Sequence, residues 1–191
     1  MTNYCEIANG HPIHGPYHDN EHGYPQKCDS TVFERFSLEV MQTGLSWLII
    51  LKKRSNMQNA FSKFCIDKVS KFQQDEVNSL MKNEGIIRNK RKITAIIENA
   101  RKIQILRQKF GSFINWIDYH HPLSQDDWVT LFRENFKFAG YSVTTEFLMS
   151  TGYLPGAHKK SCPAYKKIKL LNPPWYASKD KIHNNKKVKP S

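Results

Sequence analysis

One apolar stripe constrains the fold of this chain more than any other feature of the sequence. Between Ile93 and Leu106, aliphatic side chains recur every three or four residues, which is the spacing of one face of an α-helix. The stripe predicts a helix over about residues 89–109, ended by Gly111. No convincing strand alternation or hairpin dipeptide appears elsewhere, so we predict an all-α fold.

Shorter apolar stripes predict further helices, and turn-forming residues separate them. A capping box of Thr31 and Glu34 would begin the first, and Ser124-x-x-Asp127 would cap a later one. Residues 1–28 are rich in Gly and Pro and are expected to form an irregular arm. The remaining helices are predicted over about residues 31–43, 46–64, 67–81, 112–119 and 144–151.

The segment from residue 33 to residue 54 carries one unusual charge. Glu39 is the only charged residue between Arg35 and Lys52, and it lies at the edge of an apolar helix face. Gly44 breaks this helix, and Trp47 opens a second apolar run. A carboxylate beside an aromatic ring at such a turn is suited to a cationic or polar planar group. The alternative is that Glu39 is an exposed helix charge and Trp47 a core residue.

Two further stretches have the composition of binding sites. Gly85-Ile86-Ile87-Arg88 leads into a basic helix start, where backbone N–H groups and cations would attract an anion; a solvated helix end is the alternative. One Cys/His pair lies in the N-terminal arm, and a second has His-x3-Cys spacing. Together the two pairs would make a tetrahedral zinc site. The alternative is that the cysteines are simply buried. The candidate ligands are Cys5, His18, His158 and Cys162.

Composition limits the partners and the location. The net charge is +12, but residues 166–191 contain eight Lys and one Asp, which leaves about +5 for the rest. The basicity favours a nucleic-acid partner. We expect one domain over residues 1–168 and a Lys-rich flexible tail over residues 169–191. The sequence shows no signal peptide and no membrane span, and we expect a monomer in a bacterial-type cytoplasm.

Several motifs, in order, resemble those of the DNA-3-methyladenine glycosylase I family. They extend over most of the chain, from about residue 5 to residue 162. The motifs are Tyr17-His18-Asp19-Asn20-Glu21-x-Gly23-x-Pro25, Leu38-Glu39, Gly44-Leu45-Ser46-Trp47, Leu51-Lys52-Lys53-Arg54, Gly85-Ile86-Ile87-Arg88-Asn89 with Lys92-Ile93, and Phe136-Lys137-Phe138-x-Gly140.

The resemblance implies a helix-hairpin-helix glycosylase fold with one structural Zn²⁺ on the four candidate ligands. It also implies that the enzyme flips an alkylated base out of double-stranded DNA into a pocket. Glu39 would accept hydrogen bonds from the base, and Tyr17 and Trp47 would stack on it. The resemblance further implies that Gly44 and Leu45 fill the gap in the duplex, and that the hairpin of Gly85, Ile86, Ile87 and Arg88 holds backbone phosphate.

The sequence departs from the family pattern at three aromatic positions. Ile7, His14 and His22 stand where family members usually have aromatics. We include His14 in the substrate-binding set, with a surface position in the arm as the alternative for both histidines. No Asp occurs between Glu76 and Ile117, in agreement with a family that works without a catalytic Asp there. The predicted function is excision of 3-methyladenine; a non-catalytic or substrate-shifted lesion-binding protein is the alternative.

Overall fold

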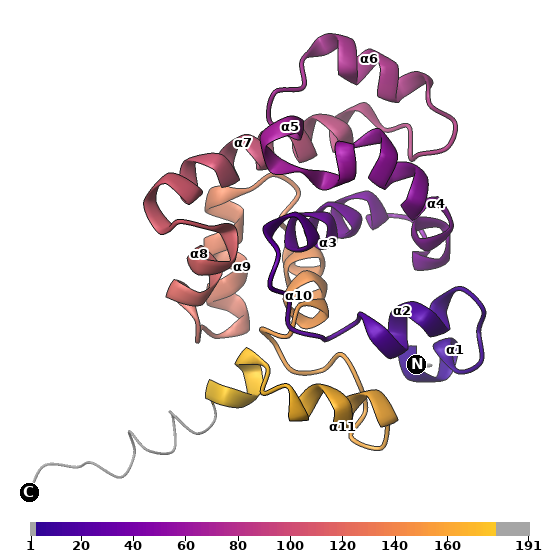
Figure 1. Cartoon of the computed structure of the whole chain (residues 1–191), viewed down its shortest axis with the longest axis vertical. Coiled ribbons are helices and arrows are strands. Elements are labelled where there is room, and N and C mark those ends of the chain that lie inside the picture. The colour runs from indigo at the N-terminus through magenta and orange to yellow at the C-terminus, as the bar shows by residue number, and fades with distance from the viewer. Residues whose placement is uncertain (1–2, 179–191) are drawn as a thin grey trace, which may run out of the picture. The chain divides into compact units, whose positions relative to one another are not determined.

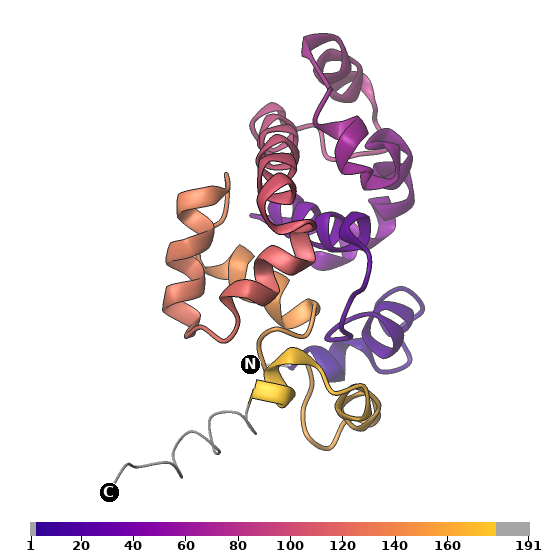
Figure 2. The same ribbon diagram turned by 60° about the vertical axis from the view of Figure 1, so that its left-hand side comes forward.

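The computed structural model describes residues 3–178 of the 191-residue chain. All regular secondary structure in this part is helical, and Figures 1 and 2 show the ribbon from two sides. The predicted all-α fold is confirmed. The helices are α1 (Tyr4–Ala8), α2 (His14–Asn20), α3 (Asp29–Gln42), α4 (Trp47–Ala60), the 3-10 turn η1 (Ser62–Phe64), α5 (Ile66–Val69), α6 (Gln74–Lys82), α7 (Lys90–Phe110), α8 (Phe113–His120), α9 (Gln125–Asn135), α10 (Tyr141–Ser150) and α11 (Pro163–Leu170).

The chain divides into two compact units. One, which we call the central unit, consists of Gln26–Phe147. The other, the terminal unit, combines Met1–Pro25 with Leu148–Ser191. Each candidate site residue can therefore be assigned to one unit. The division of the chain at residue 168 stays a prediction.

The core of the central unit contains helix α3. Ten successive residues of α3, Val32–Met41, are buried, so this part of the helix has no solvent-exposed face. The ring of Phe36 lies 5.2–5.7 Å from the rings of Phe132, Phe136 and Phe147. Such tilted and edge-to-face contacts are favourable arrangements for aromatic rings. The face of α3 that carries Phe36 therefore packs against aromatic rings.

Helix α7 follows its prediction closely. It covers Lys90–Phe110 and ends at Gly111, which has a φ of 83°. At its start, the side-chain oxygen of Asn89 accepts a hydrogen bond from the Lys92 backbone N–H at 3.2 Å. The cap and the C-terminal glycine explain why this long helix begins and ends where it does.

The prediction of an irregular N-terminal arm was wrong. Residues 4–8 and 14–20 form α1 and α2. Asn3 and Glu6 make a reciprocal capping box at the start of α1. The ring of Tyr4 packs edge-on against His14, with the ring centroids 5.6 Å apart. Aromatic packing thus stabilises helices that are too short to persist alone.

The Thr31–Glu34 capping box was also predicted wrongly. Helix α3 begins at Asp29 with Cys28 as its N-cap. Glu34 is instead buried, and its Oε1 accepts hydrogen bonds from Arg54 Nε at 2.7 Å and Gln58 Nε2 at 2.8 Å. Tertiary partners on α4 therefore take the carboxylate that the local pattern assigned to the cap. The Ser124 cap of α9 is confirmed, because Ser124 Oγ accepts from the Asp127 N–H at 3.2 Å.

The C-terminal part of the terminal unit has structure that sequence reasoning missed. Helix α11 was not predicted, and residues 174–178 are helical as well. Trp175 is buried, and its backbone N–H donates to Gly152 O at 3.1 Å. The Lys-rich stretch from residue 179 onward lies outside the described residues. Among the helices described here, none is long and apolar enough to cross a membrane.

Candidate functional site

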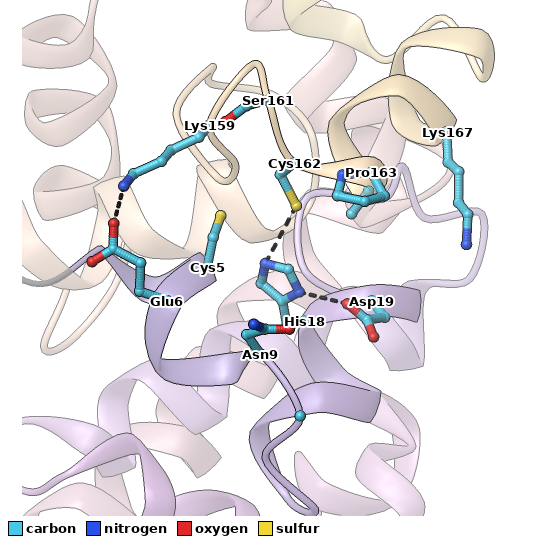
Figure 3. Close-up of a pocket in the computed structure, with 12 residues that line it drawn as sticks. Cys5, Glu6, Asn9, His18, Asp19, Lys159, Ser161, Cys162, Pro163 and Lys167 are labelled. Carbon is cyan, nitrogen blue, oxygen red and sulfur yellow. Dashed lines mark hydrogen bonds and ion pairs between the residues drawn. The ribbon is translucent and has the colours of Figure 1, made fainter.

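Four side chains of the terminal unit form a Cys2His2 cluster. Their ligand atoms all lie within 4.8 Å of one another. Figure 3 shows the sulfur atoms of Cys5 and Cys162 directed toward the same space beside His18. Helices α1 and α2 carry Cys5 and His18, and Cys162 is the N-cap of α11. The structure therefore brings together the two predicted pairs, which are far apart in sequence, with His158 as the fourth member.

The distances within the cluster suit a tetrahedral metal. Cys162 Sγ lies 3.7 Å from His18 Nε2 and 3.6 Å from His158 Nδ1. Cys5 Sγ lies 3.8 Å from His158 Nδ1. Tetrahedral zinc, with bonds of about 2.3 Å to sulfur and about 2.0 Å to nitrogen, requires sulfur–nitrogen edges of roughly 3.5 Å. The donor set and its spacing fit zinc with small adjustments.

The outer nitrogen atoms of both histidines are already hydrogen-bonded. His18 Nδ1 lies 2.7 Å from Asp19 Oδ1, and His158 Nε2 lies 2.7 Å from the carbonyl oxygen of His22. The Asp19 carboxylate and the His22 carbonyl accept hydrogen bonds, so His18 Nδ1 and His158 Nε2 carry the protons. The other two nitrogens, His18 Nε2 and His158 Nδ1, lie 3.0 Å apart and direct their lone pairs toward the cluster. This is how metal-binding histidines are usually oriented.

Glu39 is buried in the central unit. Its exposed fraction is 6%, so the interpretation of Glu39 as a surface charge was wrong. Burial and the nearby Glu146 carboxylate raise the pKa of Glu39 to about 8, while Arg35 opposes this shift. Near neutral pH the protonated form of Glu39 is consequently favoured. A cation bound beside it would lower the pKa and favour the carboxylate.

The predicted break after α3 has the backbone geometry of a type II β-turn. Thr43 has φ −49° and ψ 116°, Gly44 has φ 78°, and the Leu45 N–H donates to Gln42 O at 2.7 Å. Gly44 supplies the positive φ that side chains disfavour. A Cβ atom at Gly44 would meet nothing within 4 Å, so the apex of the turn is open. Trp47 opens α4 directly afterwards and is half-buried.

A compact turn joins α6 and α7. The Gly85 N–H donates to Asn83 Oδ1 at 2.9 Å, and the Asn89 N–H donates to Ile87 O at 2.9 Å. A Cβ atom at Gly85 would come within 2.9 Å of Asn56 Nδ2 and 3.0 Å of Asn83 Oδ1, so the Gly85 backbone lies close to both amide side chains. The turn is therefore held by polar contacts from within and from α4.

The side chains of this turn face in different directions. Ile86 is buried and fixes the turn to the core, whereas Ile87 is half-buried and Arg88 is exposed. Arg88 Nη1 lies 3.6 Å from Glu84 Oε1, a loose exposed pair of the kind that contributes little stability. The Arg88 guanidinium therefore contributes little to stability. It lies beside the start of α7, where the helix dipole and free backbone N–H groups favour anions.

Tyr17 and His14 lie on α2 in the terminal unit. Both are buried, and His14 Nδ1 lies 3.2 Å from the Tyr4 hydroxyl. His22 is buried as well, so the alternative of surface positions for His14 and His22 was wrong. Burial, with a smaller contribution from His11, lowers the pKa of His14. The assignment of Tyr17, Trp47 and His14 to base binding stays a prediction.

Comparison with known proteins agrees with this architecture. A family model described as methyladenine glycosylase matches residues 7–128. The DNA-3-methyladenine glycosylase 1 of Escherichia coli K12 is 32% identical over 180 residues, covering 84% of this chain and 96% of that protein. The DNA-3-methyladenine glycosylase of Haemophilus influenzae is 30% identical, with 85% and 98% covered.

Solved structures of similar proteins share the fold. The 3-methyladenine DNA glycosylase I of Staphylococcus aureus matches with a TM-score of 0.75 and 28% identity, covering 85% of this chain and 96% of that one. A variant of a 3-methyladenine DNA glycosylase I in complex with 3-methyladenine matches with a TM-score of 0.76 and 27% identity, with 85% and 97% covered.

The all-helical fold and these similarities define the class of the protein as a helix-hairpin-helix DNA glycosylase. Within that class, the chain belongs to the methyladenine glycosylase family.

Several residues around these sites were missed by sequence reasoning. Beyond burial, Glu146 raises the pKa of Glu39 and Arg35 lowers it. Arg35 lies four residues before Glu39 on α3, but no sequence spacing links Glu146 to Glu39. Asp19 and the carbonyl of His22 orient the two cluster histidines. Asp19 directly follows His18, so adjacency was the one available signal.

Proposed function

We propose that this protein hydrolyses the N-glycosidic bond between 3-methyladenine and deoxyribose in alkylated duplex DNA. The observation that carries the proposal is a carboxyl group, Glu39, buried in the central helix of a methyladenine glycosylase family member. The structure of one similar protein was solved in complex with 3-methyladenine itself. Methylation at N3 makes adenine cationic, so the base is already a good leaving group.

In the proposed reaction, Glu39 binds the flipped base. Its carboxylate accepts hydrogen bonds from the cationic purine, and Trp47 and Tyr17 provide stacking surfaces. Because the pKa of free Glu39 is about 8, bringing the cationic base beside it favours loss of the proton. A neutral adenine provides no such charge. Selectivity for the damaged base then follows from charge as well as from shape.

Water completes the proposed hydrolysis. The bond between C1′ and the base breaks, and its electron pair leaves with the base as neutral 3-methyladenine. Water then adds to C1′ of the oxocarbenium-like sugar and releases its proton to solvent. There is no Asp between Glu76 and Ile117 to act as a base after the hairpin. The DNA phosphates stabilise the positive charge on the sugar.

The remaining sites would bind the duplex. We propose that the turn of Gly85, Ile86, Ile87 and Arg88 holds backbone phosphate without reading sequence. Gly44 and Leu45, at the open apex of the α3–α4 turn, would fill the gap left by the flipped nucleotide. We further propose that the protein acts as a monomer, which light scattering of the protein with and without duplex DNA would test.

We propose that Cys5, His18, His158 and Cys162 hold one structural Zn²⁺. When bound, the metal would supply a cross-link between the N-terminal helices and the segment before α11. A closed set of four protein ligands leaves no position for substrate, so the role is stability and not chemistry.

The decisive experiment is incubation of the purified protein with N-methylated duplex DNA and chromatography of the released bases. Release of free 3-methyladenine, leaving abasic DNA, is expected. Tight binding to the methylated duplex without any released base would instead support the alternative of a non-catalytic lesion-binding protein. Release of a different alkylated base alone would indicate a shifted substrate.

A further inference from the structure

We propose that Lys92 is a positioning residue that fastens the α3–α4 turn to the first turn of α7. The inference rests on the proposed function, in which the α3–α4 turn enters the duplex and the α6–α7 turn grips phosphate. By joining the two turns, Lys92 would make them engage DNA as one rigid body.

The contacts of the Lys92 ammonium are specific. Its Nζ donates to Met41 O at 2.8 Å and to Thr43 O at 2.6 Å. The side chain is only 6% exposed. A buried cation is costly unless it is hydrogen-bonded, and these two carbonyl oxygens supply the bonds. They also lie at the C-terminal end of α3, where the helix dipole favours positive charge.

The contacts to Met41 and Thr43 complete the hydrogen bonding at the end of α3. A helix leaves its last carbonyl groups without partners in the helix. Val40 O accepts from Thr43 Oγ1 at 2.8 Å, and Gln42 O accepts from the Leu45 N–H at 2.7 Å. Lys92 supplies the donor for Met41 O and for Thr43 O, the residue before Gly44. Without Lys92, two carbonyls beside the apex of the turn lose a donor.

A parallel set of contacts holds the other turn. Lys53 Nζ donates to Glu84 O at 2.7 Å, and Asn56 Nδ2 lies 3.4 Å from Gly85 O. Both residues are on α4, which begins directly after the α3–α4 turn. The two turns are therefore connected by two routes, through Lys92 on α7 and through α4. Lys92 is the route that acts directly on the carbonyl next to Gly44.

The same contacts argue against two other roles for Lys92. A lysine that grips phosphate must reach solvent, and this one is buried. An amine that attacks the sugar must reach it, whereas this nitrogen is buried and held by two backbone carbonyls. Trapping of a covalent DNA adduct at Lys92 with borohydride would therefore overturn the proposal.

The first test needs no DNA. Hydrogen exchange of the free protein would be measured by mass spectrometry for wild type and for Lys92→Met, which keeps the length but loses the donors. Faster exchange over residues 42–46, with unchanged exchange over residues 83–88, is expected. The matched variant Lys53→Met should show the reverse pattern, because Lys53 binds Glu84. Unchanged exchange over residues 42–46 in Lys92→Met would overturn the proposal whatever the enzyme's activity.

The second test links the contact to the reaction through a double-mutant cycle with Leu45→Ala. Lys92→Met should lower the single-turnover excision rate about tenfold. It should lower the ratio of affinity for abasic duplex to affinity for undamaged duplex by about the same factor. Affinity for undamaged duplex should stay within about twofold of wild type. In the Leu45→Ala background Lys92→Met should add less than about twofold, because both changes act through the same turn.

Additive effects, or an equal loss on damaged and undamaged DNA, would overturn the role of Lys92. Should Lys92→Met fail to fold, Lys92→Gln, which keeps an amide donor, enters the same two tests with the same expected directions. A wild-type protein that releases no base would refute the proposed function, while the exchange experiment would still decide whether Lys92 holds the turn.

Discussion

Glu39 illustrates how one residue acquires its chemistry from its surroundings. The sequence marks it as an isolated charge, but its burial and its neighbour Glu146 give it a pKa of about 8. An ordinary surface glutamate would be ionised at neutral pH, and solvent would screen its charge. Two predictions at the scale of this residue follow, one for the reaction and one for stability.

Replacing Glu39 with Gln should slow base release while leaving the fold intact. The variant keeps the shape and loses the charge that binds the cationic purine. Loss of one charge-assisted hydrogen bond corresponds to about 1.5–3 kcal/mol, or roughly ten- to a hundredfold in the single-turnover rate. Binding to undamaged duplex should not change. Release of 3-methyladenine at the wild-type rate would leave Glu39 without a role in the reaction.

Stability should depend on pH through the same residue. Because the folded-state pKa of Glu39 lies above its unfolded value of about 4.5, folding favours the protonated form. Its contribution to stability is fully present below pH ~4.5 and is lost as the pH rises toward about 8. Glu39→Gln has no proton to lose. Urea unfolding from pH 5 to pH 8.5 should therefore show the variant gaining stability relative to wild type as the pH rises; parallel curves would contradict this.

Among the elements, the turn between α6 and α7 combines a fixed backbone with an exposed cation. Gly85 and Ile86 are held by packing, and Arg88 extends to solvent. Sequence reasoning located this turn correctly, because a glycine and a basic cluster precede the strongest helical stripe. It could not show that α4 supports the turn through Lys53 and Asn56.

Replacing Arg88 with Ala should weaken binding to damaged and undamaged DNA alike. A phosphate contact carries affinity without sequence information, so the slope of log K against log salt should flatten by about one unit. Arg133→Ala, at an exposed arginine on α9, is the matched control and should leave the slope unchanged. Weakening confined to damaged duplex would mean that Arg88 reads the lesion.

At the scale of the whole molecule, the Cys2His2 cluster joins segments that are distant in sequence. Cys5 and His18 come from the first helices, and His158 and Cys162 precede α11. The core of this region is small: Cys162, Ala164 and Ile168 are buried together, with Cys5, Tyr24 and Tyr165 against them. A metal cross-link would add the stability that such a core does not supply.

Replacing Cys162 with Ser should remove the metal and destabilise the protein. We expect about one zinc per chain in wild type purified without chelator, well below one in the variant, and a loss of roughly 2 kcal/mol or more of unfolding free energy. Mass spectrometry of metals and urea unfolding would measure both. Cys28→Ser is the control, since this exposed thiol lies outside the cluster. A metal-free wild-type protein would contradict the zinc assignment.

The sequence by itself determined the helical class, the long helix α7, the glycine turns and the four residues of the cluster. The helices depend on local periodicity and the turns on backbone conformations that glycine favours, whereas the cluster residues were identified through the order of the motifs. From spacing alone, other Cys and His residues could have been paired by chance. The order of the motifs singled out these four residues.

Only the tertiary structure decided the environment of each side chain. Glu34 leaves its predicted cap for Arg54 and Gln58, His14 and His22 are buried, and Lys92 reaches the carbonyls at the end of α3. Each outcome depends on a partner 20 or more residues away, or on burial that neighbouring residues do not specify. Desolvation and long-range hydrogen bonds arise from packing, and packing is a property of the folded chain.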